Sequence, residues 1–248
     1  MKSDFFIKNF YDKGFVVAKK VFSKKEIQSI FSQINSIKEK SIKLKNPNMH
    51  FTSDNKLNTI HDINKYVKSG PMINISKSKK ILNIVENILG EKAKVRNIEF
   101  FLKPKKSGMP SPFHQDNYYW NIINAEAVNV WIACSKVSKK NGGICYLRGS
   151  HKLGTIKHEI SNMKGSSQKI NKEIMKQLNF KKIFPKVNPG DCLIHHPEVI
   201  HGSFKNNSNT DRIGFVVSYA ASNHKIDKLN LKNYKNKMFK NLKKIYKK

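Results

Sequence analysis

Within the stretch 112–120, a histidine and an aspartate stand two positions apart, His114 and Asp116. Side chains at i and i+2 point to the same face when the backbone is extended. Pro110 and Pro112 disfavour helix here, because the residue before each proline is pushed toward extended backbone. We therefore predict that both side chains lie on one face of a strand and can bind the same ion. A His-x-Asp pair alone is weak support, since most such pairs are ordinary polar surface residues.

A third ligand is available much later in the chain, at His201. Two neutral imidazoles and one carboxylate on one side of a metal, with the other positions open, are typical of non-haem Fe(II) oxygenases. The sequence thus predicts a metal site formed by His114, Asp116 and His201. His195 and His196 lie nearby, but neither fits the ligand spacing, so we expect one of them only to line the site.

Arg212 begins a stretch that is otherwise apolar, after a run of turn-forming residues at 205–211. With the turn centred in that run, Ser203 is expected opposite Arg212 in a hairpin. A buried guanidinium is costly unless an anion pairs with it, and its fork suits a carboxylate. Two interpretations remain open at this point. One is a carboxylate-bearing ligand that also takes a hydrogen bond from Ser203, and the other is a structural ion pair with Asp or Glu.

The elements that must position these residues follow from hydrophobic periodicity and turn signals. Helices are predicted over 3–13, after the Ser23–Glu26 capping box, and over 76–89. Short strands dominate after Gly90, with a hairpin expected at 141–143. The predicted strands are 14–18, 95–103, the His114 segment, 127–137, 144–147, 192–195, 199–204 and 212–220. This pattern predicts a mainly β barrel or sandwich with flanking N-terminal helices.

Three segments lack such periodicity. We expect 46–71 to be an irregular loop that covers a substrate and the Lys- and Ser-rich segment 152–180 to form part of a pocket wall. The lysine-rich end, from 225 to 248, is expected to be a solvated charged helix or a frayed terminus. The chain, residues 1–248, is predicted to be one domain with a helical part at about 1–92, a β core at about 93–222 and a basic tail at about 223–248.

Lysine and arginine number 48 against 17 acidic residues, which gives a net charge of +31. Only three of the basic residues are arginines, Arg96, Arg148 and Arg212, whereas nucleic-acid readers usually rely on arginine. The excess therefore indicates a diffuse compositional bias, and no specific nucleic-acid partner is expected. The three cysteines are widely spaced and are expected to be reduced. With no signal peptide or membrane span recognised, we expect a cytoplasmic protein of undetermined oligomeric state.

A set of short motifs recurs in order along nearly the whole chain. They are Gly14-Phe15-Val16-Val17, Phe113-His114-Gln115-Asp116-Asn117-Tyr118-Tyr119-Trp120, Trp131-Ile132-Ala133, Asn141-Gly142-Gly143, Arg148-Gly149-Ser150-His151-Lys152, Pro189-Gly190-Asp191 and His201-Gly202-Ser203. In these motifs, and in the spacing of eleven positions from His201 to Arg212, the chain resembles the phytanoyl-CoA dioxygenase family of Fe(II)- and 2-oxoglutarate-dependent oxygenases.

The resemblance implies a double-stranded β-helix, or cupin-like jelly roll, with Fe(II) held by the predicted triad. It implies 2-oxoglutarate and O2 as co-substrates, with Arg212 and Ser203 holding the far carboxylate of 2-oxoglutarate. Asn129 falls at a co-substrate position, and Tyr118 and Trp120 at the substrate pocket. Related halogenases lack the metal carboxylate, so the presence of Asp116 implies hydroxylation of a small molecule, with release of succinate and CO2.

Two other classes of function stay open. One is a cupin-like protein without activity that binds an anionic ligand or nucleic acid, although such a protein would be expected to have lost a ligand or the arginine. The other is an oxygenase acting on a macromolecule, which would need an open groove. The identity of the substrate does not follow from the sequence.

Overall fold

The computed structural model describes residues 2–43, 48–163 and 165–246. Its α-helices are α1 (Lys2–Lys13), α2 (Lys24–Lys43), α3 (Ile63–Tyr66), α4 (Pro71–Ser76), α5 (Lys79–Leu89), α6 (Asn117–Trp120), α7 (Lys172–Gln177) and α8 (Lys228–Tyr246). Its strands are β1 (Phe15–Ala18), β2 (Met49–Phe51), β3 (Leu57–Ile60), β4 (Ala93–Lys103), β5 (Ser111–His114), β6 (Ala127–Ala133), β7 (Ile144–Leu147), β8 (His158–Met163), β9 (Ser166–Ile170), β10 (Lys182–Ile183), β11 (Cys192–His195), β12 (His201–Ser203) and β13 (Arg212–Ala221).

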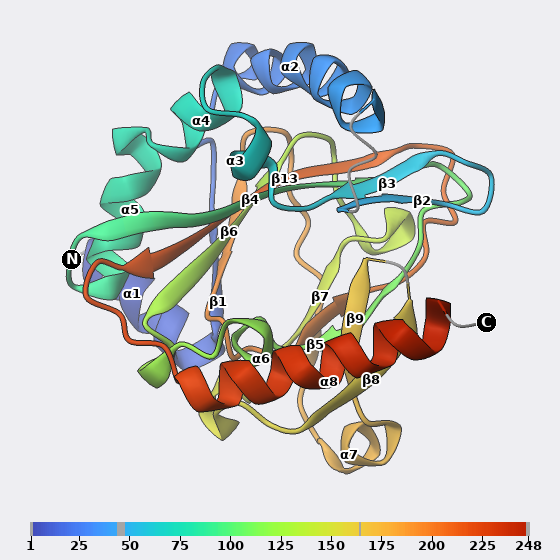
Figure 1. Ribbon diagram of the computed structural model, residues 1–248. Helices are drawn as coiled ribbons and strands as arrows, with labels where there is room; N and C mark the ends of the chain where they lie inside the picture. The colour runs from blue at the N-terminus through green and yellow to red at the C-terminus, as the bar shows by residue number, and fades with distance from the viewer. Residues whose placement is uncertain (1, 44–47, 164, 247–248) are drawn as a thin grey trace.

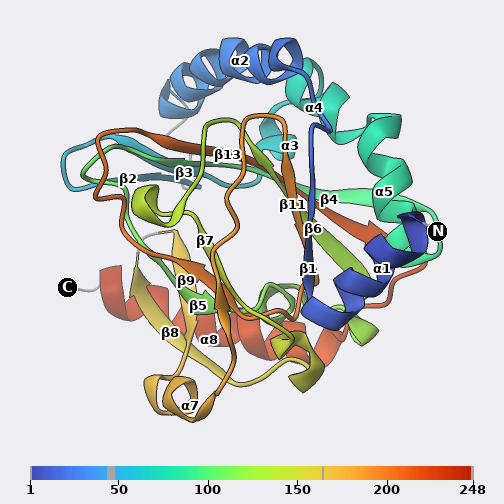
Figure 2. The ribbon, with the colours of Figure 1, turned by 180° about the vertical axis from the view of Figure 1, so that it is seen from behind.

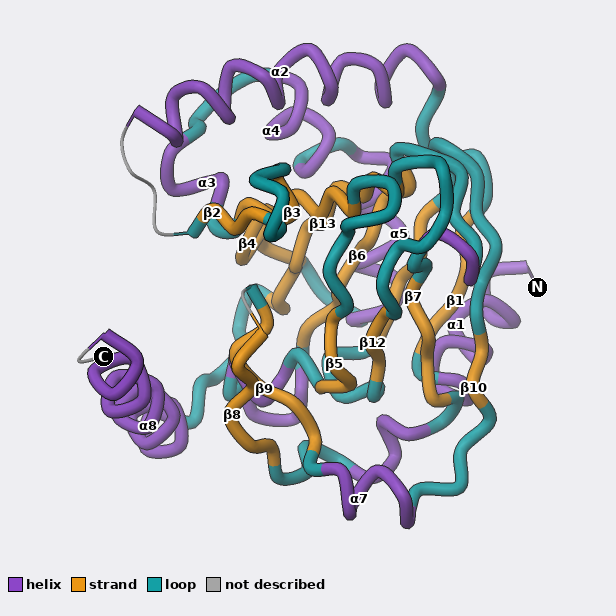
Figure 3. Tube along the Cα trace, turned by 90° about the vertical axis from the view of Figure 1, so that its right-hand side faces the viewer, coloured by secondary structure: helices purple, strands orange, loops and turns teal. Residues whose placement is uncertain are grey.

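Two antiparallel sheets face each other and form the jelly roll that the sequence predicted (Figures 1 and 3). The larger sheet has the order β1-β11-β6-β13-β4-β3-β2, and the smaller has the order β10-β7-β12-β5. Consecutive residues of each strand point to opposite faces, so one face of the larger sheet looks inward to the smaller sheet. The other face must be covered by something else.

Helices α1, α2, α4 and α5 cover that outer face (Figure 2). Along β6, Val128, Val130 and Ile132 pack into the core shared with these helices, whereas Trp131 and Ala133 pack between the sheets. Helix α2 begins with the predicted capping box, in which the backbone N–H of Ser23 donates to Glu26 at 2.8 Å. The helices thus bury one face of the larger sheet, and its other face packs against the smaller sheet and borders the cavity.

The predicted loop at 46–71 is wrong for the residues described there. β2 and β3 pair with each other and extend the larger sheet from the edge of β4. Each of these strands is too short to show a clear apolar alternation in the sequence. They form because the edge of β4 offers unpaired backbone groups. The segment nevertheless borders the cavity described below, through His50, His61 and Asp62.

Three smaller expectations also need correction. The helix predicted over 76–89 is α5, which begins later, at Lys79, while Ser76 is the last residue of a separate helix, α4. The strand predicted over 127–137 ends at Ala133. The hairpin expected at 141–143 is a short 3-10 turn that carries the chain from the larger sheet to the smaller one, since β6 and β7 lie in different sheets.

The basic tail is the helix α8, which runs along one side of the molecule beside α6 and the β8–β9 hairpin (Figures 1 and 3). Among residues 228–239 of this helix, the half-buried ones are Leu231, Tyr234 and Met238, at the i, i+3 and i+7 spacing of one helix face. Tyr234 packs edge-on against Tyr118 and Tyr119, with ring centroids 6.0 Å apart in both pairs. The tail is therefore anchored on one side and charged on the other. Within the described part of the chain, no helix has the length and apolar character needed to cross a membrane.

Candidate active site

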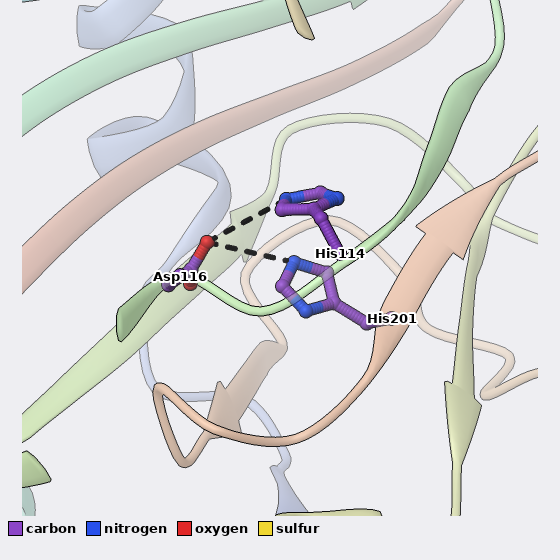
Figure 4. Close-up of side chains that lie close together, drawn as sticks. All are labelled: His114, Asp116 and His201. Atoms are coloured by element: carbon purple, nitrogen blue, oxygen red, sulfur yellow. Dashed lines mark ion pairs between the residues drawn. The ribbon is translucent and has the colours of Figure 1, made fainter. Parts of the chain in front are cut away.

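His114, Asp116 and His201 come together between the two sheets, with one ligand atom from each lying within 4.8 Å of the others (Figure 4). The pairing of β5 with β12 sets His114 directly across from His201, and their ring centroids are 4.4 Å apart. One oxygen of Asp116 lies 3.6 Å from Nε2 of His114 and 3.8 Å from Nε2 of His201. All three atoms thus converge on one point.

Asp116 reaches this point by a route that the sequence did not predict. Strand β5 ends at His114, and Asp116 has helical backbone angles at the start of α6, so the two side chains do not share one face of a strand. The turn is held by the fully buried Gln115, whose amide donates to the carbonyls of Gly154 and Glu198. The expected convergence is present, but a turn produces it.

The ring nitrogens of both histidines have defined roles. Nδ1 of His114 lies 2.7 Å from the carbonyl of Pro112, and Nδ1 of His201 lies 3.0 Å from that of Val199. A carbonyl only accepts, so each Nδ1 carries the proton and each Nε2 presents its lone pair to the centre. Burial, with a contribution from His114, lowers the pKa of His201 to about 3, so this ring is neutral at ordinary pH.

Asp116 is held at its outer oxygen, the one turned away from the centre. That oxygen accepts a hydrogen bond from the Asn129 amide at 2.7 Å and lies 3.1 Å from Nε2 of His195. Nδ1 of His195 is in turn 3.0 Å from the Tyr146 hydroxyl. Burial would raise the pKa of Asp116, but its hydrogen-bonded contacts, including the one with His195, hold that pKa well below its usual value. The carboxylate is therefore charged and oriented, as a metal ligand needs to be.

Arg212 is almost fully buried in the same cavity. Its Nε and Nη2 donate to the carbonyl of Gly142, and its guanidinium lies 5.3 Å from the centre of the Trp131 ring. No carboxylate of the described residues lies within ion-pair distance of it, which disfavours the structural ion pair. Burial lowers the pKa of Arg212 to about 9, so it is still charged at neutral pH. A Cβ on Gly214 would overlap the Trp131 indole, so glycine is required beside this arrangement.

Ser203 lines the cavity beside Arg212, but not as a hairpin partner. β12 pairs with β5 and β7, and Arg212 stands opposite Lys103 on β4, so the expected Ser203–Arg212 hairpin is wrong. Lys103 is buried and donates to the Ser203 hydroxyl at 2.6 Å and to the Phe204 carbonyl at 2.7 Å. Since the lysine fills an acceptor site of that hydroxyl, the hydroxyl proton is free to point into the cavity.

The cavity has a volume of about 400 Å³. Trp120 and Tyr119 line it, whereas Tyr118 does not, and the Tyr118 ring instead stacks on His158 with ring centroids 4.1 Å apart. Asn129 also lines the cavity, although its amide is used on Asp116. The segment 152–180 contributes to the wall through Gly165–Ser167.

Sequence reasoning missed several charged groups of the site, Arg96 among them, and the part played by His195. Lys103 was counted only as part of a lysine-rich composition, and Glu99, which pairs with His61 at 2.5 Å on the cavity wall, carried no motif. His195 was expected to line the site, and its bond to Asp116 was not foreseen. The one usable signal for Lys103 was a charged residue ending the apolar run 100–102.

Several known proteins are similar to this chain in sequence. Residues 10–214 match the family model described as phytanoyl-CoA dioxygenase. A probable alpha-ketoglutarate-dependent hypophosphite dioxygenase of Stutzerimonas stutzeri is 24% identical over 230 residues, which cover 87% of this chain and 77% of the relative. The peroxisomal phytanoyl-CoA dioxygenase of Homo sapiens is 28% identical over 154 residues, or 60% of this chain and 46% of the relative.

Solved structures share the fold at lower identity. EctD from S. alaskensis with bound Fe has a TM-score of 0.73 and 17% identity, over 90% of this chain and 78% of that one. The epimerase SnoN, in complex with Fe3+, alpha ketoglutarate and nogalamycin RO, has a TM-score of 0.69 and 15% identity, over 90% of this chain and 85% of that one. The family model matches residues 10–214, and a His-Asp-His triad is in place. This chain therefore belongs to the phytanoyl-CoA dioxygenase family of Fe(II)- and 2-oxoglutarate-dependent oxygenases.

Proposed function

We propose that this protein hydroxylates a small molecule at the expense of 2-oxoglutarate and O2, releasing succinate and CO2. The observation that carries the proposal is the position of a buried arginine without a carboxylate partner, among the described residues, in the same cavity as three converging ligand atoms. Two imidazole nitrogens and one carboxylate oxygen form the donor set typical of non-haem Fe(II).

His114, Asp116 and His201 would hold the iron, which together with 2-oxoglutarate supplies the oxidising chemistry. The protein contributes fixed ligand orientation. The Pro112 and Val199 carbonyls keep the two Nε2 atoms unprotonated, and Asn129 and His195 hold the outer oxygen of Asp116. In this assignment Asn129 acts on the metal carboxylate, and its predicted contact with 2-oxoglutarate is secondary.

Arg212 would bind the far carboxylate of 2-oxoglutarate, with the Ser203 hydroxyl as a second donor. Lys103 and Arg212 are neighbouring buried cations whose positive charges an anion would neutralise. Trp131, Val216 and Ile144 line this end of the cavity and limit its access to water. Such a site favours a dicarboxylate that bridges the arginine and the metal.

The cavity, at about 400 Å³, lies at the small end of the range of roughly 300–1,000 Å³ usual for ligand sites. This size supports a small-molecule substrate over a macromolecule. The complete ligand set supports catalysis over a role limited to binding. The three cysteines are free and buried, which suits a reducing compartment, and we propose a cytoplasmic location on that ground. We also propose that residues 1–248 act as one catalytic domain, because the N-terminal helices complete the core of the larger sheet.

Anaerobic titration with Fe(II) and 2-oxoglutarate tests the proposal through the visible charge-transfer band of the chelate. We expect the band in the native protein and its loss, together with loss of bound iron, in His114→Ala, Asp116→Ala and His201→Ala. His196→Ala is the matched control, since His196 is a half-buried histidine outside the triad. Normal iron loading of His201→Ala would remove that residue from the ligand set.

A further inference from the structure

Two arginines line the cavity, and only Arg212 has a role in the proposed function. The second is Arg96, on β4. It is the one residue of β4 between Ala93 and Lys103 without a partner on β13, because Asn97 pairs with Ser218 and Val95 with Tyr219. Arg96 is therefore the extra residue of a β-bulge. Bulges re-aim side chains and are frequent next to active sites.

The apolar residues of β4 show the effect of the bulge. Before it, Val95 and Ala93 pack on the helix-covered core, and after it Ile98 and Phe100 do so. The core-facing positions thus change from odd to even numbers at the bulge. As a result Arg96 and its neighbour Asn97 both line the cavity, although adjacent residues of a regular strand would point to opposite faces.

The Arg96 guanidinium stacks over an aromatic ring, but its N–H donors have no partner among the described residues. Its guanidinium lies 4.6 Å from the centre of the Trp120 ring, and its side chain is exposed. Among the described residues, no hydrogen bond or ion pair joins it. The three carboxylates of the cavity wall are engaged elsewhere: Glu99 pairs with His61, Asp62 with Lys65, and Asp116 with Asn129 and His195. The five N–H donors of Arg96 are therefore available to a ligand.

The two arginines act on different regions of the cavity. Arg212 is buried with Trp131 between the sheets, whereas Arg96 is exposed and lies over the ring of Trp120, which packs in a separate apolar cluster. Serine hydroxyls of Ser166 and Ser167 and the amide of Asn97 also line the cavity. Asn97 follows Arg96 directly in the chain, and its amide and the guanidinium together offer donors that suit an oxyanion.

We infer that Arg96 binds an oxyanionic group of the substrate, a carboxylate or a phosphorus oxyanion, and that the substrate is a small anion of this kind. The inference rests on the proposed function, because that function leaves the Arg96 side of the cavity to the substrate. Binding here neutralises the guanidinium, orients the substrate toward the metal ligands and selects against neutral compounds of the same size.

The chain has two tryptophans, each next to one of these arginines, and this permits a direct binding test. In a Trp131→Phe background, Trp120 is the one remaining indole and reports on ligands at Arg96. The protein, loaded anaerobically with Fe(II) and saturated with 2-oxoglutarate, is titrated in separate arms with butyrate and with inorganic phosphite while Trp120 fluorescence is recorded. The charge-transfer band is followed in the same samples as a measure of co-substrate binding.

Arg96→Gln is compared with Lys94→Gln, which removes the same charge from the same strand at an exposed position bonded to the Ser222 carbonyl. We expect one of the anions to change Trp120 fluorescence and to bind about 10- to 100-fold more weakly to Arg96→Gln, since hydrogen bonds to charged groups are worth roughly 1.5–3 kcal/mol. Lys94→Gln should bind as the parent does, and Arg96→Lys should lie between. The arm that responds identifies the kind of oxyanion.

Equal binding by Arg96→Gln and Lys94→Gln, or no response to either anion in the parent, would overturn the inference. Thermal unfolding of the two variants shows whether both are folded. Failure of the proposed function gives a different result, namely absence of the charge-transfer band in the parent. An intact charge-transfer band in Arg96→Gln together with lost anion binding would show that Arg96 is not needed for 2-oxoglutarate binding and that the added anion depends on it.

Discussion

The cavity has two cationic ends built in different ways. Arg212 is almost fully buried, is held by the Gly142 carbonyl and stands on a regular strand pairing opposite Lys103. Arg96 is exposed, is held by one aromatic face and sits at a bulge. A cation locked between two sheets can accept one anion in one position. An exposed cation held only by an aromatic ring can change its side-chain position to suit different ligands.

This difference agrees with the two roles proposed for the arginines, Arg212 binding the co-substrate and Arg96 binding the substrate. The co-substrate is the same in every turnover and is best bound by a rigid, dry site, where charge pairing is strong. The substrate is the variable partner, and loops and strand edges commonly set its recognition. The triad lies between the ends, so each end can be altered separately, and the following experiments use that separation.

The largest effect is expected at the buried end. Arg212→Ala should raise the apparent KM for 2-oxoglutarate on the order of 10²-fold or more, since truncating one side of a buried charge pair costs about 2–5 kcal/mol. Iron affinity should hardly change, and Arg212→Lys should recover only part of the loss, because a point charge cannot replace a two-pronged contact. Arg148→Ala, which removes an exposed arginine outside the cavity, is the control. An unaltered KM in folded, iron-loaded Arg212→Ala would make Arg212 a structural residue.

The next effect concerns the metal between the two ends. Asn129→Ala removes the 2.7 Å hydrogen bond to the outer oxygen of Asp116. Loss of such a support typically costs about 10- to 100-fold in metal affinity, which competition with a chelator measures. The KM for 2-oxoglutarate at saturating iron should change much less. The reverse result, normal metal affinity with a raised KM, would return Asn129 to a co-substrate role.

A smaller, pH-dependent effect is expected from Lys103, the second cation of the buried end. Burial first, and then the charge of Arg212, lowers the pKa of Lys103 well below its usual value. As the pH rises through that lowered pKa, the lysine loses its charge, so the affinity for 2-oxoglutarate should fall. Lys103→Met should show about tenfold weaker binding at lower pH, within the range for one charged hydrogen bond, and no such pH step.

Stability should respond to Lys103 in the opposite direction. The unfolded chain binds more protons than the folded one between the lowered pKa and the ordinary one, so the free energy of unfolding of the ligand-free protein should rise with pH across that window. Denaturant unfolding of the native protein and of Lys103→Met at several pH values measures the difference. A pH profile of the KM for 2-oxoglutarate that is identical in the two proteins would exclude Lys103 from the anion site.

The smallest effect is expected at α8, because none of its described residues lines the cavity. Tyr234→Ala removes two edge-on aromatic pairs and should lower the free energy of unfolding on the order of 1–2 kcal/mol. Leu229→Ala, at a position 69% exposed on the same helix, should have no measurable effect. The KM for 2-oxoglutarate should be unaltered in both. A large rise in that KM for Tyr234→Ala would mean that α8 supports the buried end as well.

Much of this protein could be predicted from local patterns. The capping box of α2, the strands at β11 and β13, the convergence of His114, Asp116 and His201, and the cavity position of Arg212 all follow from residue type and spacing. These are short-range signals or chemical necessities: a buried guanidinium needs an anion wherever the chain places it. The helix α8, by contrast, has a packing stripe that its many lysines obscured.

The sequence by itself determined which side chains can do chemistry, because ligand type, charge and turn propensity are properties of neighbouring residues. Only the tertiary structure decided how they are used. The β5–β12 register sets His114 across from His201, β4–β13 pairing brings Lys103 beside Arg212, and one extra residue turns Arg96 into the cavity. Strand register between distant segments depends on how whole faces are buried, and a shift of one residue exchanges the inner and outer sets. That information is distributed over the entire core, so no local motif could carry it.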